Sequence, residues 1–333
     1  MNLQIRRVSD ISILEWIYIA ISVISILGSL VLAGERIAFL RSLYSCKKYN
    51  GTTHQHHNHE SLCEEDDVKA DYTFAILMFW TGLFSLYHVI IGIVSARVCD
   101  IFVFMASTLI VWAYVLSNSF LVVEVNRTDA KLVRLIMVSV AAPLIIGIGI
   151  VLCRRYITSN RLLFSVPEIG GNQVLQKSFL ALLVHDSLLK FDVQMGVSVL
   201  ILWVQESFIE NAIDFLELVV ISTGLAVTVF WVIIAYLAIR LENNCLVYTF
   251  YASSLIEPAV VILNMVRMAS PSSIPWASDQ VFHASKPLVW SAYACGLLAL
   301  LSRFCTVVSM VIVQRNFGKG LKSFSKYGLM LLD

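Results

Sequence analysis

The polar residues best placed to do chemistry lie in the middle of an otherwise apolar stretch, residues 177–205. They are His185, Asp186, Lys190, Asp192 and Gln194. Ionisable side chains inside a membrane segment usually face the interior of a helix bundle or a water-filled cavity, where they carry ions or protons or pair with one another. The stretch therefore predicts an intramembrane polar cluster, which serves either as a pathway or binding site, or as a structural lock.

The charges make this stretch a marginal membrane segment on its own. Between Phe179 and Val204 there are fifteen Leu, Ile, Val or Phe residues. These favour insertion by about 7 kcal/mol, and three central charges oppose it by about 9 kcal/mol. The segment must therefore find polar partners in neighbouring helices or in water.

Helical periodicity sorts the five polar side chains onto two strips. Asp186, Lys190 and Gln194 recur at i, i+4 and i+8 and share one face. His185 and Asp192 fall on an adjoining strip. One interpretation is a structural ion pair between Asp186 and Lys190, with Asp192 at a packed interface. The other is a polar pathway, relay or binding site.

Two more charges lie inside later apolar segments. Glu257 and Arg303 have opposite charge, and they are natural partners for each other or for Asp192 and Lys190, because an unpaired charge in hydrocarbon is costly. Pro258 follows Glu257 and predicts a bend that frees a backbone carbonyl, as in sites built from discontinuous membrane helices.

Composition places the chain among membrane proteins. Of its 333 residues, 58% are hydrophobic and only 14% are charged, and the mean hydropathy is +0.80. A soluble domain has about 45–50% apolar and 25% charged residues. The formal net charge of +1 indicates no nucleic-acid partner. We expect an all-α, polytopic integral membrane protein whose main partner is the lipid bilayer.

Apolar runs predict about eight transmembrane helices. They are residues 17–33, 72–94, 101–123, 132–153, 179–204, 215–239, 246–266 and 288–313. The main predicted polar segments are the N-terminus 1–16, a His-rich acidic loop 34–71, a basic loop 154–178, a loop 267–287 and a basic tail 314–333. An alternative is that residues 17–33 are a cleaved signal peptide behind Arg6 and Arg7.

The distribution of Lys and Arg favours both termini in the cytoplasm. Twelve lie on the predicted cytoplasmic side and nine on the other side, where the positive-inside rule expects fewer. The glycosylation-type triplets that begin at Asn50 and Asn126 then fall on the lumenal or extracellular side, as modification requires. The basic tail is suited to contact anionic lipid, although a plain positive-inside anchor explains it equally well.

The first polar loop contains potential metal ligands and a potential disulfide. The ligands are His54, His56, His57 and His59. They could bind Zn²⁺, but their irregular spacing sets no tetrahedral geometry, so we favour a solvated loop and expect no cofactor. In an oxidising compartment Cys46 and Cys63 could form a disulfide.

Known catalytic motifs are absent from the sequence. It has no GxSxG, HExxH or Walker A motif, and no GxGxxG in a suitable context. We therefore expect a transporter or channel-like protein for a small solute or ion, in a plasma membrane or endomembrane. The alternative is a receptor or scaffold whose intramembrane charges are structural salt bridges, and a membrane-embedded enzyme ranks third.

Overall fold

The described part of the chain is entirely helical. The computed structural model describes residues 11–50, 60–121, 129–159, 173–203, 215–269 and 286–318, with side chains over 11–39, 72–116, 132–158, 174–202, 222–266 and 290–318. Within these ranges the helices are α1 (Ile13–Asn50), α2 (Glu60–Val94), α3 (Val98–Leu121), α4 (Asp129–Ser159), α6 (Gln173–Trp203), α7 (Phe215–Leu241), α8 (Asn244–Ser253), α9 (Ile256–Ala269) and α11 (Lys286–Gln314).

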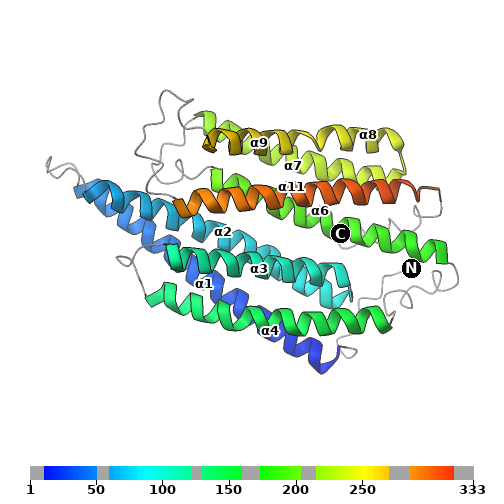
Figure 1. Ribbon diagram of the computed structural model, residues 1–333, viewed down its shortest axis with the longest axis horizontal. Helices are drawn as coiled ribbons and strands as arrows, with labels where there is room; N and C mark the ends of the chain where they lie inside the picture. The colour runs from blue at the N-terminus through cyan, green and yellow to red at the C-terminus, as the bar shows by residue number, and fades with distance from the viewer. Residues whose placement is uncertain are drawn as a thin grey trace.

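The helices form two sets that lie side by side (Figure 1). Helices α1 to α4 pack together as the first set, around Tyr18, Ile101 and Phe104. Helices α6, α7, α8, α9 and α11 form the second set, around Trp231 and Phe250. Helix α6 also contacts α2 and α3, so it lies at the seam between the two sets.

Two tight turns have the same construction. Ala96 between α2 and α3, and Glu242 between α7 and α8, adopt the left-handed conformation with φ of 51° and 48°. After the first, the Arg97 N–H donates to the Gly92 carbonyl at 2.9 Å, which closes the helix end as in a Schellman motif. Both turns lie at the same end of the bundle (Figure 1), and the first one positions Arg97 beside the seam.

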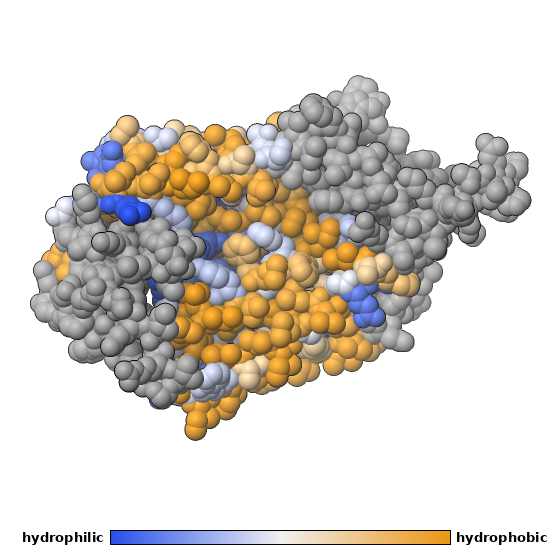
Figure 2. Space-filling model, turned by 180° about the vertical axis from the view of Figure 1, so that it is seen from behind, coloured by the Kyte–Doolittle hydropathy of each residue, from blue (hydrophilic) through white to orange (hydrophobic). Residues whose placement is uncertain are grey.

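The helices have the length and composition of membrane spans. Seven helical segments of the described ranges are long and apolar enough to cross a membrane. They are Ile13–Phe39, Tyr72–Val94, Val98–Leu116, Leu132–Thr158, Ser222–Leu241, Asn244–Val266 and Trp290–Gln314. Hydrophobic residues cover most of the visible coloured surface, with hydrophilic residues in the seam (Figure 2). The predicted class is confirmed: the chain is a multi-pass helical membrane protein.

The charged segment of the sequence lies within α6 and is too polar to count among those seven. Helix α6 has 31 residues and is therefore about 46 Å long, more than the roughly 30 Å of a hydrocarbon core. It runs alongside the other helices (Figure 1). Its position at the seam supplies the polar neighbours that its composition requires.

Over residues 34–50 and 60–71 the structure has helices where the sequence predicted an irregular loop. Helix α1 continues to Asn50, and α2 already begins at Glu60. The reason is local: residues 35–50 contain neither Gly nor Pro, and the charged and long side chains here are good helix formers. Helices α1 and α2 are therefore longer than a hydrocarbon core of roughly 30 Å requires.

Several predicted positions lie outside the described side chains. They are the zinc candidates His54, His56, His57 and His59, the disulfide pair Cys46 and Cys63, the glycosylation candidates Asn50 and Asn126, and residues 319–333 of the basic tail.

The predicted crossing 246–266 is divided into two helices. Helix α8 ends at Ser253 and α9 begins at Ile256. Pro258 has no N–H to donate to the Ser254 carbonyl, so the regular hydrogen-bond ladder is interrupted here. Glu257 is the second residue of α9, and its side chain lies against Gly196 of α6.

Candidate functional site

Helix α6 places a series of polar side chains inside the bundle. His185, Asp192 and Gln194 are at most 1% exposed, and Asp186 is 9% exposed. Buried charges are tolerated in such a position only when they are paired and hydrogen-bonded. Partners for α6 come from both helix sets, and they form two clusters.

The first cluster, called here the Asp186 cluster, consists of Asp186, Lys190, Arg97, Asp100 and Tyr236. Asp186 Oδ2 lies 2.8 Å from both Arg97 Nη1 and Lys190 Nζ. The Tyr236 hydroxyl of α7 donates to Asp186 Oδ1 at 3.0 Å. The cluster therefore joins α6 to the α2–α3 turn and to α7.

The Asp186 cluster is balanced in charge. Its two cations, Arg97 and Lys190, face the carboxylates of Asp186 and Asp100. Arg97 Nη1 lies 3.9 Å from Asp100 Oδ2. Asp100 Oδ1 accepts a hydrogen bond from Ser187 at 3.0 Å and lies 3.4 Å from His88 Nδ1. Because its charges balance, this cluster can stay inside the bundle without a further ion.

The second cluster, called here the Arg303 triad, consists of Arg303 of α11, Asp192 of α6 and Glu257 of α9. Arg303 Nε lies 2.8 Å from Asp192 Oδ2, and Arg303 Nη2 donates to Glu257 Oε2. Ser302 Oγ donates to Asp192 Oδ1 at 2.9 Å. The Arg303 guanidinium also lies over the Trp231 ring, 3.6 Å from its centroid, in cation–π geometry.

The Arg303 triad is unbalanced in charge. One guanidinium faces two carboxylates, and the described residues contribute no further cation in ion-pair distance of Asp192 or Glu257. Asp192 is engaged on both oxygens, since Oδ2 lies 2.8 Å from Arg303 Nε and Oδ1 accepts a hydrogen bond from Ser302. When both carboxylates are ionised, the triad carries one negative charge within the bundle.

Gly196 allows Glu257 to approach α6. A Cβ atom at this position would lie 2.6 Å from Glu257 Oε1. We expect Gly196→Ala to push the carboxylate away from Arg303 and to lower the free energy of unfolding by about 1–3 kcal/mol, as overpacking does. The measurement is a denaturant titration of the purified protein in mixed micelles.

Gly147→Ala is the matched control for that substitution. A Cβ atom at Gly147, in α4, would meet nothing within 4 Å. Alanine is favoured over glycine in a helix by about 0.5–1 kcal/mol, so this variant should be as stable as the parent or slightly more stable. Equal behaviour of the two variants would contradict the role given to Gly196.

The remaining predicted residues of α6 lie apart from these two clusters. His185 Nδ1 is 2.7 Å from Ser309 Oγ of α11. Gln194 Oε1 accepts a hydrogen bond from Ser107 of α3 at 3.2 Å. The seven residues predicted as one intramembrane cluster are thus separated into the Asp186 cluster, the Arg303 triad and two neutral contacts.

Sequence reasoning missed Arg97 and Asp100. Arg97 is one of the twelve Lys and Arg residues that the sequence assigned to cytoplasmic loops, yet it is 3% exposed, and Asp100 is 0% exposed. The available signal was their spacing: a cation and an anion three residues apart, in one of the two shortest predicted connections. Moving Arg97 out of the loop count reduces the charge excess on which the predicted orientation depends.

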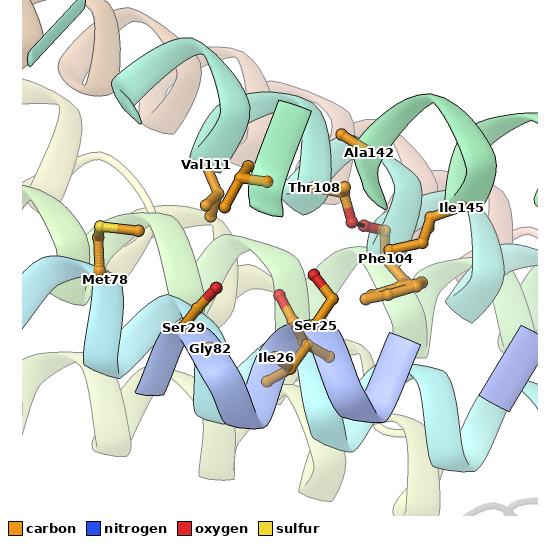
Figure 3. Close-up of a pocket in the computed structure, with 12 residues that line it drawn as sticks. Ser25, Ile26, Ser29, Met78, Gly82, Phe104, Thr108, Val111, Ala142 and Ile145 are labelled. Atoms are coloured by element: carbon orange, nitrogen blue, oxygen red, sulfur yellow. Dashed lines mark hydrogen bonds between the residues drawn. The ribbon is translucent and has the colours of Figure 1, made fainter. Parts of the chain in front are cut away.

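A small cavity lies away from this chemistry, among α1 to α4. Its volume is about 40 Å³, enough for a few water molecules. Ser25, Ser29 and Thr108 line it together with apolar side chains (Figure 3). None of its lining residues belongs to α6, so this cavity and the charged clusters are separate features.

Sequence comparisons place these clusters within a family. A family model described as "Domain of unknown function (DUF7789)" matches residues 59–157 and 169–312. The match covers most of the chain and includes every residue of the Asp186 cluster and the Arg303 triad, and the chain belongs to this family. Comparisons with curated proteins and with solved structures found no match.

Proposed function

We propose that this member of the family is a transporter or channel-like protein, which moves a small solute or ion along the seam between its two helix sets. The observation that supports this most is the position of α6. This helix contacts both sets, and it carries the Asp186 cluster and Asp192 of the Arg303 triad. A seam between helix bundles with charges near its middle is where membrane transporters hold their substrates and coupling ions.

The two clusters lie at different depths along the seam. Asp186 and Asp192 are six residues apart on one helix, which corresponds to about 9 Å along its axis. Each cluster reaches the surface in part: the side chains of Lys190 and Glu257 are 16% and 21% exposed. A solute that enters the seam would therefore meet charged groups in succession.

Shared partners allow these charges to rearrange. Asp186 has two cations at 2.8 Å, and Arg303 contacts two carboxylates. Because each of these central groups has two partners, it can release one and remain paired with the other. Such an exchange suits a carrier, in which contacts must change as access alternates between the two sides.

A receptor or scaffold is the second candidate. The ion pairs at 2.8 Å favour it, because fully paired charges can simply lock the two helix sets together. In that case the seam stays closed, and a partner binds elsewhere on the protein.

Transport by reconstituted protein is the direct test. We expect vesicles that contain the full chain to give transport currents, on a solid-supported membrane, with at least one solute from a panel of monovalent cations, small anions, amino acids and sugars. Asp192→Asn should abolish this current while the protein stays folded, because Glu257 still neutralises Arg303 in this variant.

Glu35→Gln is the control, since Glu35 is an exposed residue of α1. This variant should keep the full current. If wild-type vesicles behave like empty vesicles with every solute, or if Asp192→Asn keeps its current, the transport proposal is wrong and the receptor or scaffold is favoured.

A further inference from the structure

The unbalanced charge of the Arg303 triad has to be compensated. An isolated charge in the low-dielectric interior costs several kcal/mol or more, and such groups usually take up a proton or a counter-ion instead. Asp192 is 1% exposed, so bulk water does not solvate its carboxylate. The Glu257 side chain is only 21% exposed, so its surroundings offset the excess charge in part and the triad favours one additional positive charge.

The neighbours of Asp192 limit what can supply this charge. The charged groups that act on it are Arg303 of α11 and Glu257 of α9. At the adjacent part of α6, helices α2 and α3 present the uncharged Trp80 and Ser107, which contact Gln194. The Asp186 cluster lies nearer the N-terminus of α6, and Lys190 is already paired with Asp186 there.

A proton fits this site better than a metal ion does. A hard metal cation needs about six oxygen ligands, whereas the oxygen-bearing side chains in contact here are the two carboxylates and Ser302. The Arg303 guanidinium stands between the carboxylates and would repel a metal. A proton needs only one lone pair of a carboxylate oxygen, and each carboxylate has more acceptor sites than a single contact with Arg303 uses.

We propose that the Arg303 triad binds one exchangeable proton, shared between Asp192 and Glu257. When one of these carboxylates is protonated, Arg303 forms its ion pair with the other one. The proton comes from water on one side of the membrane and leaves to water on the other, and no other bond changes. This inference rests on the proposed transport function, for which it makes the proton the coupling ion.

Infrared spectroscopy of the full chain in lipid nanodiscs tests the proton site directly. As the pH is lowered, we expect the wild-type protein to gain a carbonyl band of a buried protonated carboxyl group, and this band should shift in heavy water. Asp192→Asn and Glu257→Gln should each lose the band, since one carboxylate paired with one guanidinium is already neutral. Glu35→Gln, on the exposed face of α1, should keep it.

Trp231 offers a second readout that does not require a charge variant. Arg303 lies over its ring, so a change of partner at Arg303 should alter the tryptophan emission over the same pH range. Trp231→Phe should remove that change. An emission change that survives Trp231→Phe would count against the proposal.

Three outcomes would overturn the proton site. One is a wild-type spectrum without a pH-dependent carboxyl band, and another is a band that survives both carboxylate substitutions. The third is a spectrum that responds to sodium chloride at constant pH and not to pH, which would assign the charge to a metal cation.

The proton site and the transport function can fail separately. A titrating band in a protein that moves no solute would disprove the transport proposal and leave the proton site intact. Transport that is independent of pH, in a protein without a titrating carboxyl band, would disprove the proton site and leave the transport proposal intact.

Discussion

Replacing Arg303 with methionine is expected to lower the free energy of unfolding by about 3–5 kcal/mol, because it leaves two buried carboxylates without their cation. Asp192 and Glu257 both depend on this guanidinium. The substitution also removes the contact with the Trp231 ring. A denaturant titration of the purified protein in mixed micelles measures the loss.

Removing the charges of the two carboxylates should restore the stability of this variant. Adding Asp192→Asn and Glu257→Gln to Arg303→Met makes the whole triad neutral, and neutral groups of similar volume often replace a buried ion pair at little cost. We therefore expect the triple variant to recover most of the lost stability. Arg240→Met is the control, since Arg240 is an exposed residue at the end of α7, and it should change stability by less than about 0.5 kcal/mol.

The comparison of these variants shows whether Arg303 is a buried charge of the bundle or behaves like an exposed surface residue. Equal stability of Arg303→Met and Arg240→Met would contradict the triad as described. A triple variant that is less stable than Arg303→Met would show that hydrogen bonds and packing, more than charge balance, hold these side chains in place.

Asp186→Asn should have the second largest effect, at the lower end of the same range of about 3–5 kcal/mol. It leaves Arg97 and Lys190 facing only one carboxylate, that of Asp100. The loss is smaller than at Arg303 because the carboxylate of Asp100 still faces the two cations, whereas Arg303→Met leaves both Asp192 and Glu257 without their cation. Thermal unfolding in detergent measures it.

The double variant Asp186→Asn with Lys190→Met is the internal control. It restores the balance, with one cation and one carboxylate in the cluster, and it should be more stable than Asp186→Asn alone. A double variant whose loss of stability relative to the parent equals the sum of the losses in Asp186→Asn and Lys190→Met would mean that the two residues act independently, against the 2.8 Å contact between them.

Local pattern was sufficient to identify part of the candidate site. The spacing of Asp186 and Lys190 at i and i+4 indicated their ion pair, since a helix brings such residues together whatever surrounds it. The opposite charges of Glu257 and Arg303 indicated that they could be partners, because charges inside the membrane must be paired. The function of these residues stays a proposal.

Other contacts of the site could not be derived in this way. Arg97 and Asp186 are 89 residues apart, and Ser302 and Asp192 are 110 residues apart. Arg97 ends a helix, where an arginine usually points to water, and only the packing of α6 beside the α2–α3 turn directs it inward. Gly196 carries no polar pattern at all, and its role depends on the close approach of Glu257.

The sequence by itself determined the class of this protein: long apolar runs must form helices in a bilayer, where each backbone polar group needs a partner within its own segment. It also determined that α6 requires polar neighbours, since the cost of its three central charges exceeds the gain from its apolar residues. Only the tertiary structure decided which neighbours these are, because helix packing selects among several partners that are equally acceptable by charge. That selection leaves one cluster neutral and the Arg303 triad one positive charge short.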